Sequence, residues 1–257
     1  MNTNKILLPP ALIKLGEKKY MNQFFDGNMR ISPISKFKKM EEGKDKIADK
    51  YEGELYHPVE NLYIAPILSD TKEKIKYGKP IKISNETELK FSYQNLLNSA
   101  MFSLYSYWYQ PINSVVRLDN YDMVTKDMPN YDSAVIIYNP LKFIEKIEKI
   151  TSIYCNHIQY TDETPNDFEI ENKLQTLFYK RKQFEEQKEF RIILPEIKLD
   201  DSTSIQITSL EDCAYLVPLT VLKKGILIAD SIENFNQLSN KHSNMKFGDL
   251  LHFSDFA

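Results

Sequence analysis

Short apolar runs of β-strand type recur along this chain, and the segments between them are too short for a regular alternation of strands and helices. Runs of this kind occupy residues 133–138, 153–160, 189–194, 205–207 and 214–218. A doubly wound sheet needs a helix between successive strands. The pattern therefore predicts an α+β fold with mixed or antiparallel sheets and flanking helices.

The size and composition of the chain predict one large domain over residues 1–257, with two domains as the alternative. Of its 257 residues, 42% are hydrophobic, which is enough apolar material for a single core. The formal net charge is -3, so no global positive field draws the protein onto nucleic acid or an anionic membrane.

The cysteines and the apolar segments indicate a protein of the reducing cytoplasm. Cys155 and Cys213 lack the spacing of a zinc site or a disulfide framework, and we expect both to be buried packing residues. The first fifteen residues make a poor signal peptide because Pro9 and Pro10 interrupt their apolar run. No run approaches the roughly 20 apolar residues of a membrane helix, so we expect a cytoplasmic protein without a membrane partner.

Three stretches carry helical spacing of their apolar side chains. The first is Lys18 to Phe25, followed by Gly27 as a stop, and the second is Leu141 to Ile150, which follows Asn139-Pro140. The third is a helix of about five turns that starts at the capping pair Asn166 and Glu169 and ends near Phe184.

The other segments predict strands and surface structure. Residues 29–32 alternate apolar and polar side chains as in a half-buried strand, and the aromatic stretch 98–108 reads as a buried strand. The charged stretch 35–54 predicts a surface helix or loop, and residues 56–89 predict strands and loops.

The strong catalytic and metal-binding motifs are missing from the sequence. It contains no GxGxxG, P-loop, HExxH, GxSxG or EF-hand pattern, and only seven glycines. The four histidines are scattered, and none has a partner at metal-ligand spacing. The sequence therefore predicts no metal site, and a metal-dependent nuclease is disfavoured because the acidic residues are not grouped as metal ligands.

One polar run stands out, and it reads Phe-Glu-Glu-Gln-Lys-Glu-Phe-Arg-Ile-Ile-Leu-Pro over residues 184–195. If residues 187–194 form a strand, Gln187, Glu189 and Arg191 share one face with Ile193, and the other face points to the core. Two interpretations of the polar face are open. It either walls a cleft, or it meets water with Glu189 and Arg191 paired to neighbours across the sheet. The basic cluster at residues 180–182 likewise predicts either a solvated face of the long helix or a phosphate contact.

The polar run resembles the Q/E-x-E signature of mono-ADP-ribosyltransferases of the Arg-Ser-Glu class. It is also similar to an uncharacterised bacterial domain family in which a Q/E-x-E-aromatic-Arg motif precedes an apolar strand. The ordered elements that carry this second resemblance span most of the chain, namely Met29-Arg30-Ile31-Ser32, Asp49 to Gly53, Met101-Phe102-Ser103 and Phe184 to Leu194. The resemblance implies an ADP-ribosyltransferase-like fold.

The resemblance also implies catalytic roles for Glu189 and Gln187, with NAD as a substrate. Cleavage of the bond between nicotinamide and ribose builds positive charge on the sugar, which a nearby carboxylate stabilises in the transition state. Glu189 matches that carboxylate. Gln187, two residues earlier, matches the residue that orients the acceptor nucleophile.

The same resemblance implies a set of cofactor-binding residues. Arg30 would bind a pyrophosphate oxygen of NAD, which suits a guanidinium fork. Ser103 would support the nicotinamide pocket, with Phe102 or Tyr105 as a stacking surface. Arg191 has no fixed place in the transferase pattern, and it either keeps Glu189 ionised or binds phosphate.

These expectations describe an NAD-dependent ADP-ribosyltransferase-like toxin or phage-defence effector that modifies an intracellular protein or nucleic acid. The alternative is a non-catalytic module that uses the same fold to bind a nucleotide or a partner, since a fold does not fix a function.

Overall fold

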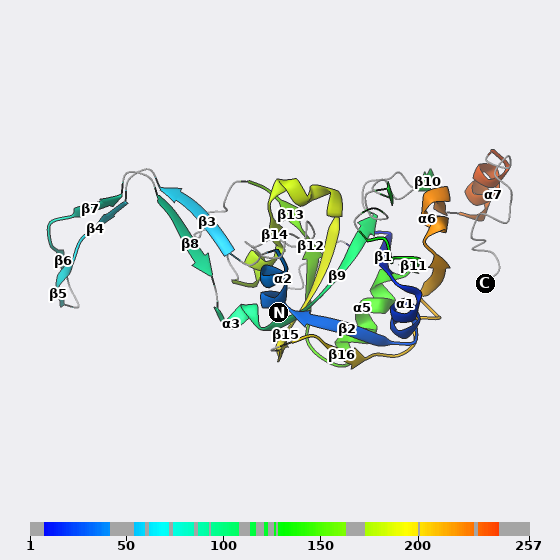
Figure 1. The fold of residues 1–257 in the computed structure, drawn as a ribbon, viewed down its shortest axis with the longest axis horizontal. Helices are drawn as coiled ribbons and strands as arrows, with labels where there is room; N and C mark the ends of the chain where they lie inside the picture. Colours follow the sequence, from blue (N-terminus) through cyan, green and yellow to red (C-terminus); the bar gives the residue numbers. More distant parts are fainter. Residues whose placement is uncertain are drawn as a thin grey trace.

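The computed structural model describes most of the chain as one body with a projecting arm (Figure 1). The described residues are 8–41, 54–59, 62–71, 74–84, 87–92, 94–107, 114–116, 121–122, 126, 128–162, 173–199, 201–228 and 231–241. Asp49 to Gly53, Asn166, Glu169 and Trp108 lie outside these ranges.

An eight-stranded, mainly antiparallel sheet forms the centre of the body, which confirms the α+β prediction. Its main path follows the order β12-β15-β9-β1-β11-β17, while β2 pairs with β9 and with β16. The strands are β1 (Ala11–Gly16), β2 (Asn28–Pro33), β9 (Ser99–Tyr107), β11 (Ser133–Ile137), β12 (Tyr154–His157), β15 (Glu189–Lys198), β16 (Thr203–Gln206) and β17 (Ala214–Pro218). The strands predicted at residues 29–32, 98–108, 133–138 and 214–218 therefore all belong to one sheet.

The central strand β9 is paired differently along its two edges. One edge runs along β15 from Ala100 to Tyr105. The other edge is shared, because β2 pairs with β9 only at residues 100–101 and β1 pairs with it only at residues 105–107. We call the place where β1 and β2 diverge beside residues 102–104 the fork of the sheet.

Short helices cover the sheet, and two of the three predicted helices are confirmed. Helix α1 spans Lys18–Phe25, and Gly27 follows it with a positive φ of 95°. Helix α5 spans Pro140–Glu148, and its N-cap Asn139 accepts a hydrogen bond from the backbone N–H of Lys142. Further helices are α2 (Ile34–Glu41), α3 (Gln94–Leu97), α6 (Thr220–Lys224) and α7 (Ile232–Lys241).

The predicted third helix is wrong over residues 173–184. Two 3-10 helices, η2 (Lys173–Phe178) and η3 (Lys182–Gln187), occupy this stretch with the short strand β14 (Tyr179–Lys180) between them. Strand β14 pairs in parallel with β13 (Gln159–Tyr160). Because tight turns also bury Leu177, Phe178 and Phe184, the apolar spacing fits these segments as well as it fits an α-helix.

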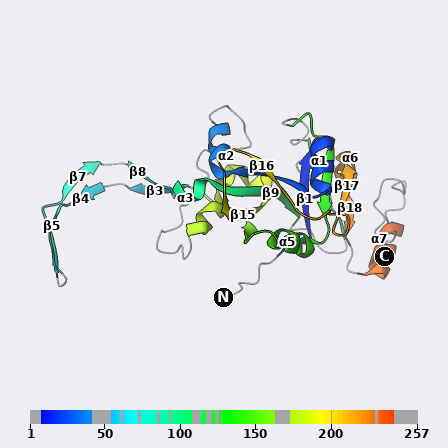
Figure 2. The same ribbon diagram turned by 90° about the horizontal axis from the view of Figure 1, so that it is seen from below.

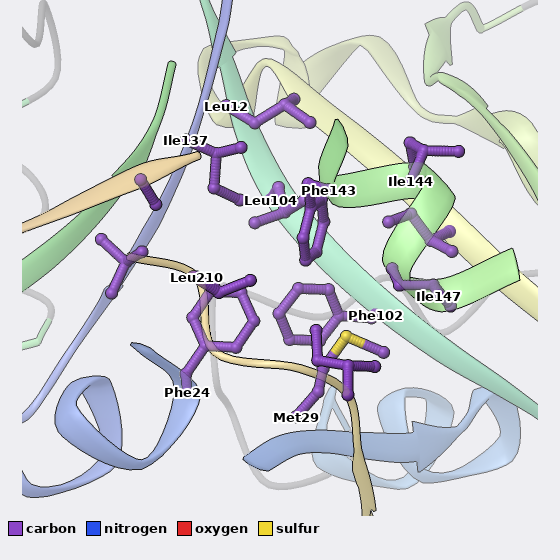
Figure 3. Close-up of a cluster of buried hydrophobic side chains, with 14 of the residues drawn as sticks. Leu12, Phe24, Met29, Phe102, Leu104, Ile137, Phe143, Ile144, Ile147 and Leu210 are labelled. Carbon is purple, nitrogen blue, oxygen red and sulfur yellow. The ribbon is translucent and has the colours of Figure 1, made fainter. Parts of the chain in front are cut away.

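Apolar side chains cover both faces of the sheet. On one face, Phe24 of α1, Phe143 of α5 and Phe102 of β9 pack in the largest cluster (Figure 3). The opposite face carries two separate clusters, one around Ile13, Tyr105 and Ile136 and one around Ile34, Met101 and Ile193. The polar side chains described below lie between these two clusters.

A long two-stranded arm projects from the body beside α2 and α3 (Figures 1 and 2). Three successive antiparallel pairs build it, namely β3 (Glu54–Val59) with β8 (Thr87–Ser92), β4 (Leu62–Ile64) with β7 (Ile81–Ser84), and β5 (Ile67–Thr71) with β6 (Lys74–Tyr77). A smaller pair, β10 (Ser114–Val116) with β18 (Ile226–Ile228), lies near α7. Strands are thus confirmed in the region 56–89.

The cysteines behave as the sequence predicts. Cys155 and Cys213 are both buried and form no disulfide. Among the described residues, none of the helices combines the length and the apolar character that crossing a membrane requires.

Candidate functional site

Glu189 is the first residue of β15, and its carboxylate is the centre of a buried polar cluster. The residue is only 8% exposed. Its Oε1 atom accepts hydrogen bonds from Ser103 Oγ at 2.5 Å and from Arg191 Nε at 2.9 Å. Its Oε2 atom accepts from Lys180 Nζ at 3.2 Å. Both carboxylate oxygens are therefore held by side chains of the chain itself.

Arg191 is fully buried two residues further along β15. Its guanidinium forms an ion pair with Glu189 at 2.9 Å and donates to the backbone carbonyl of Leu177. The interpretation of this run as a solvated strand face is therefore wrong. The loops around η2 cover the polar face as completely as the core covers the other one, since Leu177 is itself buried against Ile193.

Lys180 is a further residue of the cluster, and of its two predicted settings, a solvated helix face or a phosphate contact, the solvated helix face is wrong. It is 6% exposed because β14, rather than a helix, carries it. Its Nζ atom donates to Gln187 Oε1 at 2.7 Å and to Glu189 Oε2 at 3.2 Å. Lys182, two residues later, is exposed as predicted.

Gln187 belongs to the same cluster, although it does not lie on β15. It ends η3, and Lys188 then takes a left-handed conformation with a φ of 40°, which ends the expected strand alternation. The carbonyl of Lys188 accepts from both the N–H and the hydroxyl of Ser106, at 2.8 and 2.9 Å, which fixes this turn to β9. Gln187 thus reaches Glu189 through the shared Lys180 ammonium.

The cluster keeps Glu189 ionised. Burial raises the pKa of this carboxyl, but the charges of Arg191 and Lys180 and the hydrogen bonds from Ser103 and Arg191 lower it by more, to about 2. A buried carboxylate that is negative at neutral pH can stabilise a positive charge that develops beside it.

The structure brings together only some of the cofactor residues implied by the resemblance. Ser103 contacts Glu189, and Tyr105 of β9 is the register partner of Glu189. Phe102 points to the opposite face, where its ring lies 5.1 Å from that of Phe24 (Figure 3). Phe102 is therefore a core residue, because neighbouring side chains of a strand alternate between faces.

Arg30 lies apart from the cluster. It is exposed on β2, opposite Ser204 of β16 rather than opposite a residue of β9 or β15. The nearby carboxyl of Asp201 has a lowered pKa, mainly because of Lys36 and to a smaller extent because of Arg30. The separation arises at the fork, where β2 leaves β9 after Met101.

Three residues near the cluster were missed by sequence reasoning. They are Lys180, Tyr160, whose hydroxyl accepts from the backbone N–H of Glu189 at 2.8 Å, and Lys14, whose Nζ donates to the carbonyl of Ser103 at 2.7 Å. The sequence feature that could have pointed to such a residue is a charged side chain inside an apolar run, as at Lys14 between Ile13 and Leu15.

The described residues contain no group of three or more His, Cys, Asp or Glu side chains that could hold a metal ion. Comparisons of the chain with protein-family models, with curated proteins and with solved structures found no match.

Proposed function

We propose that this protein is an NAD-dependent ADP-ribosyltransferase-like toxin or defence effector that modifies an intracellular macromolecule. The observation that carries the proposal is the contact between Ser103 of β9 and the ionised carboxylate of Glu189 on β15. The transferase resemblance assigns a serine and a glutamate on two core strands to one site, and these two residues meet in the sheet.

The chemistry follows from the charge that develops on the sugar. As nicotinamide leaves, the ribose becomes oxocarbenium-like, and the Glu189 carboxylate stabilises it more in the transition state than in the ground state. The ribose hydroxyls would replace Lys180 on Oε2, since that contact, at 3.2 Å, is the longest of the carboxylate. Gln187 would then orient the acceptor.

A second candidate is a non-catalytic module that binds a nucleotide or a partner. Two observations favour it. Both oxygens of the Glu189 carboxylate are already engaged by Lys180, Arg191 and Ser103. Arg30, which the resemblance assigns to the pyrophosphate, lies outside the cluster.

Incubation with labelled NAD and cell lysate separates the two candidates. We expect the wild type to release nicotinamide and to transfer label to a lysate component. Ser103→Ala should lower nicotinamide release by roughly 100-fold, the order of loss when one preorganised donor is removed from an active site. Ser32→Ala is the matched control, because Ser32 lies on β2 and its hydroxyl bonds only to Ser202 among the contacts of the described residues.

The melting temperature with ADP-ribose completes the test. A folded wild type that consumes no NAD but is stabilised by ADP-ribose would overturn the transferase and support the binding module, because a ligand of the native state stabilises it by mass action. Equal loss of activity in Ser103→Ala and Ser32→Ala would remove Ser103 from the site.

A further inference from the structure

The outer arm, residues 62–71 and 74–84, stands clear of the central sheet (Figures 1 and 2). It consists of β4 paired with β7 and β5 paired with β6. None of its side chains whose exposure the structure describes is buried, and Tyr63 and Ile81 are 56% and 61% exposed. A two-stranded ribbon is only marginally stable in water by itself. The outer arm therefore adds little to the stability of the fold, and its surface is free to contact a partner.

The outer arm is basic, although the chain as a whole is acidic. Its sequence contains one acidic residue, Asp70, and the four lysines Lys74, Lys76, Lys79 and Lys82. The formal net charge of the outer arm is thus +3, and because all 257 residues together carry -3, the rest of the chain carries -6. The inner pair of the arm, β3 with β8, is not basic, since it contains two glutamates and one lysine. Positive charge is therefore concentrated in the part of the arm that lies farthest from the body.

Tyr63 and Lys82 share one exposed face of the outer arm. They are opposite each other in the register of β4 and β7, and the Lys82 Nζ atom lies 5.9 Å from the centroid of the Tyr63 ring. Lys79, in the turn before β7, is exposed as well. The ion pairs of the described residues include neither Lys79 nor Lys82. This face therefore presents a phenol beside ammonium groups that no described carboxylate neutralises.

The two strands of the outer arm stay bonded to each other where the ribbon changes direction, between β4–β7 and β5–β6 (Figure 2). At this joint the N–H of Gly78 donates to the carbonyl of Pro66 at 2.7 Å. A Cβ atom at position 78 would lie 2.8 Å from Pro66 Cγ, so the close approach requires glycine. Residues 62–71 extend at most about 33 Å at the usual rise of a strand. This length is about one helical turn of B-form DNA.

The shape and the charge of the outer arm suit one anionic partner in particular. The major groove of B-form DNA admits a two-stranded ribbon, and lysine and tyrosine side chains both contact phosphate oxygens. A second copy of the chain fits less well, because Asp201, Asp212 and Glu189 are already paired with cations of their own chain. We infer that the outer arm binds duplex DNA in the major groove, with Lys79 and Lys82 on phosphates. This inference goes beyond the proposed function and does not depend on it.

The test is a titration of a labelled DNA duplex of about 20 base pairs with the full chain, followed by fluorescence anisotropy. We expect the double variant Lys79→Ala, Lys82→Ala to bind at least about 10-fold more weakly than the wild type at low salt, the order of one lost charge-assisted hydrogen bond. The dependence of log K on log salt concentration should become less steep by about 2, because each phosphate contact releases counterions worth about 0.9.

Lys18→Ala with Lys19→Ala is the matched control on the body. Both lysines are exposed on α1, and the Lys19 Nζ atom lies 5.8 Å from the centroid of the Tyr20 ring, which reproduces the chemistry of the outer arm. This control should bind DNA like the wild type, and circular dichroism should show both double variants folded because they change exposed side chains only. Equal losses in the two double variants, or no duplex binding by the wild type, would overturn the inference. Tighter binding of an RNA duplex would also overturn it, because the major groove of A-form RNA is too narrow for the ribbon.

Two further measurements separate this inference from its rivals. Sedimentation velocity should show the same oligomeric state for the wild type and for the Lys79, Lys82 variant, and a wild-type dimer that this variant breaks would give the outer arm to a second copy and overturn DNA binding. Nicotinamide release is measured without DNA. A wild type that binds the duplex through Lys79 and Lys82 but releases no nicotinamide keeps this inference and loses the transferase, and release without duplex binding does the reverse.

Discussion

The two faces of β15 are equally buried over residues 189–194 but differ in chemistry, because one of them carries Glu189 and Arg191 beside Ile193. Phe190, Ile192 and Leu194 lie in the apolar core and are fully buried. On the other face, Arg191 is also fully buried and Glu189 is 8% exposed. Burial on β15 therefore does not follow hydrophobicity alone, because a face that carries charged side chains is also interior.

The comparison also has an energetic meaning. Apolar burial stabilises the fold directly, whereas the desolvation of a buried ion pair often exceeds its Coulombic gain. Well-packed apolar residues in place of Lys180, Glu189 and Arg191 should hold the sheet about as well. A cluster that contributes so little net stability is a natural candidate for function.

The largest expected effect comes from removing one partner of the buried ion pair on the polar face. Arg191→Met should lower the free energy of unfolding by about 3–5 kcal/mol, because it leaves a buried carboxylate with one cation fewer. Urea denaturation measures the loss. The triple change Lys180→Met, Glu189→Leu and Arg191→Met should recover most of it, and a triple variant less stable than the single one would mean that the cluster is a stabilising element.

The matched change on the apolar face is Ile192→Ala. Ile192 is adjacent to Arg191 and fully buried, so the cavity should cost about 2–5 kcal/mol. Tyr154→Ala on the neighbouring strand β12 is the control, since that side chain is exposed and should change stability by at most about 0.5 kcal/mol. The same urea titrations apply, and a loss below 1 kcal/mol for Ile192→Ala would contradict close packing on this face.

Stability should depend on pH in two ranges, one set by His157 on the apolar face of β15 and a lower one set by Glu189 on the polar face. Burial lowers the pKa of His157, which packs on Phe190, from 6.5 to about 4. The neutral His157 side chain therefore contributes fully to the free energy of unfolding above pH 6.5, and this contribution is lost as the pH falls towards 4. The Glu189 carboxyl, with a pKa of about 2, loses its contribution only below about pH 4.5.

Thermal melts between pH 7 and pH 3 measure both windows. His157→Gln should flatten the upper one and leave the fall below about pH 4.5. Hydrogen bonds from Lys142 and Lys146 lower the pKa of the Asp212 carboxyl to about 2, so Asp212 also contributes to the fall in stability below about pH 4.5. An unchanged slope between pH 6.5 and 4 in His157→Gln would assign that window to other groups.

The smallest effect belongs to an ion pair outside both faces. Lys36 and Asp201 lie 2.7 Å apart, but the Asp201 side chain is 79% exposed. Solvent screens such pairs, so Asp201→Asn should leave the urea midpoint within error of the wild type. A clear shift of that midpoint would show that charge matters at the rim of the sheet as well as inside it.

Local patterns in the sequence account for much of this fold. Helix α1 begins and ends as predicted because its apolar spacing and Gly27 agree. Strand β17 also matches the predicted residues 214–218. The stretch 173–184 failed because the spacing of Leu177, Phe178 and Phe184 does not distinguish an α-helix from two tight turns around a short strand.

The candidate site was only partly predictable, for a different reason. Strand alternation assigns Glu189 and Arg191 to one face, but it does not say what covers that face. Strand alternation also does not predict which strands are neighbours in the sheet. It therefore could not show that Arg30 lies apart from Ser103, which follows from the divergence of β2 from β9 after Met101. The burial of Lys180 was not predicted because the residue was expected on a helix, whereas it lies on the short strand β14.

The central position of β9 also has a consequence during protein synthesis. Strand β15 follows β9 by a long stretch of chain, so the edge of β9 that will receive it leaves the ribosome first. Non-local strand pairing is slow, and an unpaired strand edge is a template for aggregation. Nascent chains that stop before β15 should therefore depend on chaperones, and Ser103 can meet its carboxylate only after β15 has been synthesised.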